Sequence, residues 1–300
     1  MTIPSALLLH FDDEQPMAQR LAQASGIECA AIARHRFPDG ELKLRLPATV
    51  PTRVVLLRSL DHPNEKLVEL LLAARTARAL GARHLTLVAP YMAYMRQDIA
   101  FNPGEVVSQQ VVGSFLADLF DAVITVDPHL HRIERLEQAI PVPQAVVLSG
   151  APLLAELLAR ELDRPVLIGP DAESAQWIAQ AASAHGFAHG VCHKDRHGDR
   201  EVTIHLPDLN VQDRAVVVLD DVASSGRTLA GATRLLLAAG AASVDVAVTH
   251  ALFAGDALDV IHSAGVRHVW STDCITHASN AVSVAPALAD ALCTIFSSSQ

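Results

Sequence analysis

The residues best suited to chemistry lie in the segment VVVLDDVASSGRTL, at positions 216–229. A fully apolar stretch of strand character ends in two adjacent acids, Asp220 and Asp221, and small residues then lead to a helical pattern that begins near Thr228. Ligands of open α/β sheets bind beyond the carboxyl ends of the strands, and helix N-termini attract anions. This order of residues therefore favours a phosphate site with acidic groups beside it.

The loop between the acids and the helix carries the groups that such a ligand needs. Ser224, Ser225 and Thr228 offer hydroxyl donors. Gly226 lets the backbone approach closely, and Arg227 adds a cation. The paired acids suit sugar hydroxyls or a metal ion. The alternative is helix capping, but capping needs one Asp or Ser, whereas two acids and three hydroxyls follow this strand.

The order of strand, two acids, small loop and S/T-G-x-T resembles the phosphoribosyl pyrophosphate loop of type I phosphoribosyltransferases and of the ribose-phosphate diphosphokinase family. Further segments between Phe37 and Thr228 resemble the diphosphokinases, in the same order along the chain. The segments in the first half of the chain are absent from simple phosphoribosyltransferases. Each motif is weak by itself, but motifs that occur in the same order as in the family are together specific.

One such segment is Phe37-Pro38-Asp39-Gly40-Glu41. Considered alone, it indicates a turn with an aromatic residue before it and an acid after it. It is similar to the segment with which the family contacts adenine from a neighbouring subunit. The resemblance thus implies a homo-oligomer with a shared adenine site, and adenine contacts by Phe37, Asp39 and Glu41.

A second segment, Tyr91 to Asp98, follows the strand-like run LTLVAP and has the form Y-x-x-Y-x-R-Q-D. An arginine fork just beyond a strand suits a polyphosphate, although an isolated Arg-Gln-Asp can equally be a solvated loop. The family's corresponding Arg and Gln hold ATP, which implies this role for Arg96 and Gln97.

Two segments are similar to the family's metal-linked residues. Thr125-Val126-Asp127-Pro128-His129 has the family's form T-V-D-x-H, in which the histidine assists the Mg²⁺ of MgATP. Asp171, in Gly169-Pro170-Asp171, matches a carboxylate linked to the metal on the ribose 5-phosphate side, or it caps the helix that follows. The resemblance implies Mg²⁺ as the cofactor. His131 forms an H-x-H pair with His129, which could suggest a zinc site, but this pair alone lacks the third and fourth ligands that zinc needs.

The polar stretch HKDRHGDR, from His193, lies between two strand-like runs. It corresponds to a family loop of the form Lys-x-Arg that closes over the triphosphate, which implies catalytic roles for Lys194 and Arg196. Two cations on a glycine-containing loop suit transition-state stabilisation, and a solvated hairpin is the alternative.

The chain departs from common family members at four places. Ile99 to Glu105 replaces a run with further arginines and is closer to archaeal-type members. Ser224 stands where an acid is common, Arg227 where glycine is common, and His193 where an acid precedes the catalytic lysine. These changes put phosphate activation and nucleotide inhibition in doubt, while the cationic loop and the paired acids stay intact.

Charge and composition exclude other classes of protein. The 300 residues include 23 basic and 33 acidic ones, a formal net charge of −10, so the chain lacks the basic excess of a nucleic-acid binder. Phosphorylated ligands must then meet a local cationic patch, for which we predict Arg96, Lys194, Arg196 and Arg227.

The apolar runs and the cysteines indicate the compartment. No run approaches the roughly 18 residues of a membrane span, and the start MTIPSALLLHFDDE lacks the basic residues of a signal peptide. The four cysteines are scattered without a C-x-x-C pair, which suits neither a disulfide framework nor a thiolate zinc site. We expect a cytoplasmic protein that is not bound to a membrane.

The elements that must position these residues alternate between strand and helix. Apolar runs at 54–57, 85–88, 122–125, 166–168 and 216–219 alternate with Ala/Leu-rich helical stretches, which predicts parallel sheets covered by helices. In each half, a strand and a helix are followed by Gly-Ala and a second strand, with Gly81 and Gly240 at the helix ends.

This repeat predicts an α/β fold of two related domains, each a mostly parallel sheet flanked by helices, of type I phosphoribosyltransferase kind. The seam falls in the proline-rich stretch 141–152. We therefore expect an ATP-side domain at 1–146 and a ribose 5-phosphate-side domain at 147–300.

The resemblance implies that MgATP and ribose 5-phosphate are converted to AMP and phosphoribosyl pyrophosphate. Two alternatives remain: a phosphoribosyltransferase that consumes phosphoribosyl pyrophosphate, and a non-catalytic relative that binds nucleotides and regulates a partner. The first predicts no use of Phe37 to Glu41 or of Arg96. The second would be favoured by loss of the paired acids or the Lys-Arg loop, and neither is lost.

Overall fold

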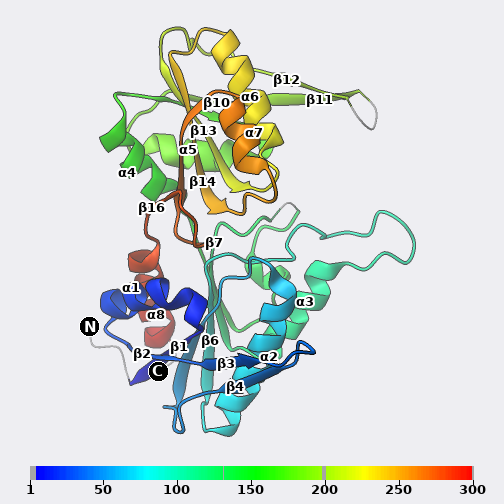
Figure 1. The fold of residues 1–300 in the computed structure, drawn as a ribbon, viewed down its shortest axis with the longest axis vertical. Coiled ribbons are helices and arrows are strands. Elements are labelled where there is room, and N and C mark those ends of the chain that lie inside the picture. The colour runs from blue at the N-terminus through cyan, green and yellow to red at the C-terminus, as the bar shows by residue number, and fades with distance from the viewer. Residues whose placement is uncertain (1–4, 131, 198–200, 299–300) are drawn as a thin grey trace. The chain divides into compact units, whose positions relative to one another are not determined.

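The computed structural model describes residues 5–130, 132–197 and 201–298, and for 194–197, 201–203 and 298 it describes the backbone alone. The chain forms two compact units. Unit 1 comprises Met1–Leu148 and Val284–Gln300, and unit 2 comprises Ser149–Ser283. Each unit contains one six-stranded parallel sheet and one separate two-stranded antiparallel sheet (Figure 1).

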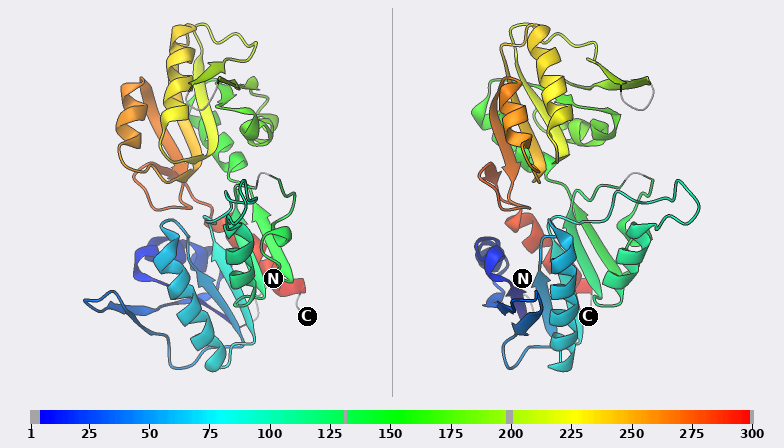
Figure 2. Two further views of the ribbon diagram at one scale, coloured as in Figure 1. Left: turned by 90° about the vertical axis from the view of Figure 1, so that its right-hand side faces the viewer. Right: turned by 45° about the vertical axis from the view of Figure 1, so that its right-hand side comes forward.

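The sheet of unit 1 has the strand order β2-β1-β5-β6-β7-β8. Its strands are β1 (Ala6–His10), β2 (Glu28–Ala31), β5 (Arg53–Leu57), β6 (His84–Ala89), β7 (Ala122–Val126) and β8 (Gln144–Leu148). Helices α2 (Pro63–Ala79) and α3 (Ser108–Ala117) cover one face, while α1 (Gln15–Ser25) and α8 (Ala285–Ser298) pack together on the other (Figure 2). Because both faces are covered, the inner strands are mostly apolar and buried, and the two threonines among them, Thr86 and Thr125, are buried as well.

The sheet of unit 2 has the order β10-β9-β13-β14-β15-β16. Its strands are β9 (Val166–Gly169), β10 (His189–Val191), β13 (Ala215–Ala223), β14 (Ser243–Ala251), β15 (Val266–Thr272) and β16 (Asn280–Val282). Helices α6 (Arg227–Ala238) and α7 (Ala257–Ser263) share one apolar core with it, and α4 (Ala151–Glu161) and α5 (Ala175–Ser183) share a second.

The two sheets have the same topology, which confirms the repeat seen in the sequence. In each unit the second strand is at the edge, an antiparallel hairpin follows it, and the next strand pairs with the first. The hairpins are β3 (Ala33–Arg36) with β4 (Leu42–Arg45), and β11 (His193–His197) with β12 (Glu201–His205). Gly81 and Gly240 follow equivalent helices with φ of 110° and 90°, as helix-ending glycines do.

Two boundaries differ from the expectation. The predicted second domain, 147–300, includes α8, but this helix belongs to unit 1 because its apolar face, with Leu288, Leu292 and Phe296 fully or almost fully buried, packs beside α1. The proline-rich stretch 141–152 also contains a strand, β8, which pairs with β7. Prolines flank β8 without interrupting its ladder.

Among the described residues, no helix is both long and apolar enough to cross a membrane.

Candidate active site

The phosphate loop predicted in unit 2 lies between β13 and α6. β13 continues through Asp220 and Asp221 to Ala223, so the strand is longer than expected. Gly226 is the residue before α6 and has a left-handed φ of 69°. A Cβ at this position would lie 2.8 Å from the Ala257 carbonyl oxygen and 2.9 Å from the Ile261 side chain, so only glycine fits without displacing α7.

A cleft of about 140 Å³ opens at this loop. Of the residues predicted to bind ribose 5-phosphate, five line it: Asp220, Ser224, Ser225, Gly226 and Thr228. The other two are not among its lining residues. Asp221 is buried at 3% exposure, and Arg227 is exposed in the first turn of α6. The cleft thus combines an acid, hydroxyls and a helix N-terminus, a set that fits a phosphorylated sugar.

Asp171 follows β9 on the neighbouring strand of the same sheet and caps a short 3₁₀ turn, Ala172–Ser174. Its Oδ1 accepts a hydrogen bond of 3.2 Å from the Glu173 amide. The capping reading of this residue is therefore observed. The metal role of Asp171 stays a prediction.

The stretch predicted as a cationic loop is part of hairpin β11–β12. The backbone of Lys194 pairs with that of Ile204, and Arg196 pairs with Val202. The side chains of Lys194 and Arg196 lie outside the described part of the structure. This hairpin is the counterpart in unit 2 of β3–β4, so the segment predicted to be a cationic loop and the segment predicted to contact adenine lie on equivalent elements.

In unit 1, the segments after β6 and β7 begin at the same end of the sheet, because these neighbouring strands are parallel and pair with Ala89 opposite Thr125. Arg96 is exposed, and Gln97 donates from Nε2 to the Ile99 carbonyl oxygen at 3.0 Å. His129, after β7, is half-buried. The structure thus brings Arg96, Gln97 and His129 to the carboxyl end of adjacent strands, where ligands of such sheets bind.

The remaining predicted residues occupy the turn of hairpin β3–β4, which projects from the main sheet of unit 1 (Figure 2). The Phe37 amide donates to the Glu41 carbonyl oxygen at 2.8 Å, and the Glu41 amide donates to Asp39 Oδ1 at 3.2 Å. Phe37 is 40% exposed. An exposed aromatic ring with two carboxylates at the tip of a hairpin can contact a base and its amino groups.

Sequence reasoning did not find the residues that hold these segments. Arg132 donates to Asp98 Oδ1 at 2.6 Å and so joins the segment after β7 to the one after β6. The buried Gln109, in α3, donates from Nε2 to the Met95 carbonyl oxygen at 3.1 Å. The only sequence signal for Gln109 was a glutamine, a residue type that is usually exposed, on the apolar face of a helix. Nothing in the sequence pairs Asp98 with Arg132.

Among described His, Cys, Asp and Glu side chains, no group of three or more could hold a metal ion. His129 and Asp171 belong to different units. Each therefore stays a separate prediction as a metal ligand; Mg²⁺ is commonly bound through one or two carboxylates, water and substrate phosphates rather than by a cage of protein ligands.

The repeated sheet and the cleft at the predicted phosphate loop after β13 are those of a phosphoribosyltransferase-type fold. Residues 144–290 match the phosphoribosyl transferase domain, and residues 6–119 match the N-terminal domain of ribose phosphate pyrophosphokinase. The chain belongs to the ribose-phosphate pyrophosphokinase family. Ribose-phosphate diphosphokinase is another name for the same enzymes.

Relatives of known name span nearly the whole chain. A ribose-phosphate pyrophosphokinase of Methanopyrus kandleri is 36% identical over 92% of this chain and 94% of its own length. One of Halobacterium salinarum is 35% identical over 95% of this chain and 100% of its own. The phosphoribosylpyrophosphate synthetase structure from Mycobacterium smegmatis shares the fold, with a TM-score of 0.84 and 22% identity over 98% of this chain and 100% of its own.

Proposed function

We propose that this protein transfers the diphosphate group of MgATP to O1 of ribose 5-phosphate, giving AMP and phosphoribosyl pyrophosphate. The observation that carries the proposal is the cleft at 220–229, lined by Asp220, Ser224, Ser225 and Thr228 at the start of a helix, in a chain whose residues 6–119 match the family's N-terminal domain. A phosphoribosyltransferase would use this cleft but would have no use for the N-terminal domain.

In this reaction the sugar O1 attacks the β-phosphorus of ATP. A bond forms between O1 and the β-phosphorus. The bond between the β-phosphorus and the oxygen that bridges it to the α-phosphorus breaks, that oxygen leaves with AMP, and the O1 proton is released. The chemistry depends mainly on positioning and charge neutralisation. Loop amides at 224–226, with Ser224, Ser225 and Thr228, hold the 5-phosphate. Asp220 orients the ribose hydroxyls, and the buried Asp221 supports the loop.

Unit 1 supplies the ATP contacts in this proposal. Arg96 and Gln97 hold the triphosphate, and Phe37, Asp39 and Glu41 surround the adenine of a neighbouring subunit. Lys194 and Arg196 neutralise the transferring diphosphate. Such contacts are worth most where the charge develops in the transition state.

Mg²⁺, bound to the phosphates of ATP, would neutralise their charge and make the β-phosphorus accessible to O1. Asp171 would hold it through an oxygen ligand, and His129 would act through a water molecule, because Mg²⁺ prefers oxygen to imidazole nitrogen.

The test is to incubate the protein with MgATP and ribose 5-phosphate and to separate the nucleotides. AMP that forms only when the sugar is present supports the proposal. ADP would indicate transfer of a single phosphoryl group, and no turnover would leave a nucleotide-binding protein without this activity. Either result defeats the proposal.

A further inference from the structure

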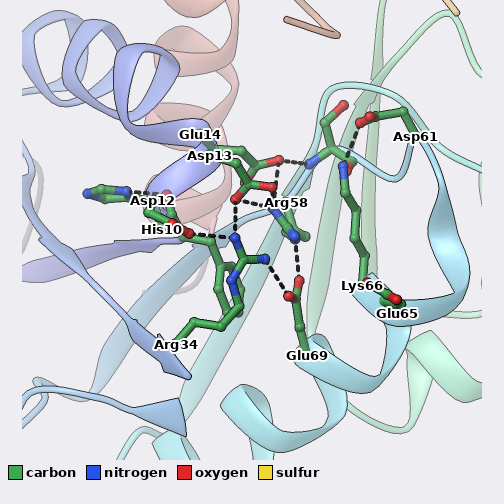
Figure 3. A network of polar contacts seen from close by, with 12 residues as sticks. His10, Asp12, Asp13, Glu14, Arg34, Arg58, Asp61, Glu65, Lys66 and Glu69 are labelled. Carbon is green, nitrogen blue, oxygen red and sulfur yellow. Dashed lines mark hydrogen bonds and ion pairs between the residues drawn. The ribbon is translucent and has the colours of Figure 1, made fainter. Parts of the chain in front are cut away.

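The carboxyl end of β5 in unit 1 carries a cluster of ionisable residues to which the proposed mechanism assigns no role. Aligning the equivalent strands β5 and β13 puts Arg58 and Ser59 at the positions of Asp220 and Asp221. Where unit 2 has the acids of its phosphate loop, unit 1 has a guanidinium group that is 1% exposed. We call Asp12, Asp13, Glu14, Arg34, Arg58 and Glu69 the β5-end cluster (Figure 3).

Glu69, in α2, is the centre of this cluster and is also 1% exposed. Its Oε1 accepts from Arg34 Nη1 at 2.6 Å, and its Oε2 accepts from Arg58 Nη2. Both carboxylate oxygens are therefore used by guanidinium groups that come from different elements. Arg58 and Arg34 also lie over the ring of the buried Phe11, with their Cζ atoms 4.6 and 5.6 Å from its centroid.

One arm of the cluster holds the hairpin that carries Phe37 to Glu41. Arg34 lies in β3, and besides Glu69 it binds Asp12 Oδ1 at 2.6 Å. Arg36, at the end of β3, forms a two-pronged ion pair with Glu65 of α2, one turn before Glu69. Because β3–β4 is outside the main sheet, these ion pairs to α2 and to the turn after β1, together with Leu44 packed against the core of unit 1, hold the hairpin in its direction.

The other arm reaches the segment that carries Arg96 and Gln97. Arg58 Nη1 donates to both oxygens of Asp13, at 2.8 and 2.9 Å. The next residue, Ser59, donates its amide to Glu14 and accepts at Oγ from the Tyr91 amide at 3.1 Å. The Leu60 amide then donates to the Tyr91 carbonyl oxygen at 2.9 Å. The start of the segment 91–98 is thus tied to the loop that Arg58 begins.

We propose that Glu69, through Arg34 and Arg58, is a positioning residue that sets both nucleotide-contacting segments of unit 1, the hairpin tip at 37–41 and the segment 91–98. This inference rests on the proposed function, because it assigns both segments to ATP. A buried carboxylate that pairs two arginines is held by charge-assisted bonds of well-defined direction, which suits precise positioning more than general stabilisation.

The test uses the full-length variant Glu69→Gln, which keeps the side-chain volume but turns one oxygen acceptor into an NH₂ donor facing a guanidinium group. We expect the KM for ATP to rise about tenfold or more, the scale of losing a charged hydrogen bond. The KM for ribose 5-phosphate should stay within about twofold, because its residues belong to unit 2. Hydrogen exchange should become faster in peptides covering 33–45 and 91–98.

The matched control is Arg78→Gln, which removes an ion pair of 2.7 Å to Asp121 from the other end of the same helix. It should leave the KM for ATP and the exchange of both peptides unchanged. If both variants change ATP affinity alike, or if Glu69→Gln changes both substrates alike, α2 merely supports the fold and the proposal is wrong.

Arg34→Gln tests the hairpin arm even if Glu69→Gln fails to fold, because Arg34 is less buried and Arg58 still neutralises Glu69. We expect faster exchange in 33–45 and unchanged exchange in 91–98, with partial rescue by Arg34→Lys, which can keep one of the ion pairs. Unchanged exchange of the hairpin in Arg34→Gln would overturn the proposal. Exchange is measured without substrates, so it remains decisive even if the wild-type protein forms no AMP.

Discussion

Glu14 offers a quantitative test of the electrostatics of unit 1. It lies at the end of the 3₁₀ turn after β1 and is 8% exposed. Its Oε1 accepts from the Ser59 amide, while its Oε2 is buried without a hydrogen-bond partner. Burial raises the pKa of this carboxyl from 4.5 to about 8, against the opposing effects of Arg58 and the Ser59 amide. The neighbouring Asp13 adds to the rise, and Glu14 is then largely protonated at neutral pH.

The direction of the pH dependence follows from proton binding. Between pH 4.5 and about 8, the folded protein keeps the Glu14 proton and the unfolded chain has lost it. Unfolding therefore releases a proton, and the free energy of unfolding falls as the pH rises through this window. At about 1.4 kcal/mol per pKa unit, the loss is on the order of 5 kcal/mol. It is absent below pH 4.5 and complete above about pH 8.

Glu14→Gln copies the neutral carboxyl and should remove this loss. We expect the variant to match the wild type near pH 5 and to exceed it in stability by several kcal/mol near pH 9. Urea unfolding at a series of pH values measures the difference, with hydrogen exchange of unit 1 peptides as the probe. Fluorescence of Trp177 and Trp270 follows unit 2, which contains both tryptophans of the chain, and provides an internal control.

A difference between variant and wild type that is the same at pH 5 and pH 9 would refute this reasoning. It would mean that Glu14 is ionised throughout and that Arg58 compensates fully for its burial. A difference that also appears in the tryptophan signal would indicate a change outside unit 1, and the site-specific interpretation would be lost.

Three other predictions concern the proposed active site. Lys194→Ala should lower kcat by at least about 100-fold with little change in ATP affinity, and near-normal turnover in steady-state assays would remove Lys194 from the mechanism. Gly226→Ala should raise the KM for ribose 5-phosphate about tenfold or more and lower the melting temperature, because it combines backbone strain of about 1–3 kcal/mol with a backbone clash. The control is Gly186→Ala, at a φ of 64°, where an added Cβ would meet nothing within 4 Å. It should leave the KM for ribose 5-phosphate unchanged. Arg132→Gln leaves the carboxylate of Asp98, 2% exposed, without its ion pair, and should raise the KM for ATP but not for ribose 5-phosphate in the same assay.

Much of the fold could be predicted because its signals are local. Each predicted strand is present within a few residues, from β5 at Arg53–Leu57 to β13 at Ala215–Ala223, since an apolar run bounded by turns needs no distant partner to be recognised. The helix-ending glycines at 81 and 240 were predictable for the same reason. The stretch from His193 was expected as a loop, with a hairpin as the alternative, and it forms strand β11, which pairs with β12 over the strand-like run at 202–204.

The candidate site could be predicted only in part. The composition of 220–228 indicated a phosphate loop, since its acid, hydroxyls and glycine are consecutive in the chain. That Asp221 is buried and Arg227 lies outside the cleft could not be predicted, because both depend on how β13 and α6 are turned against their neighbours. Only the packing of α7 shows that Gly226 is required for space as well as for its φ.

The sequence by itself determined the parallel α/β class, the internal repeat and the chemistry of the loop after β13, because periodicity and consecutive residue types report on nearest neighbours. Only the tertiary structure decided that Arg58 meets Asp13, 45 residues away, that Arg34 meets Glu69, and that α8 returns to unit 1. Ion pairs and helix docking depend on which side chains lie within a few ångströms after folding. A single sequence carries no direct record of those distances.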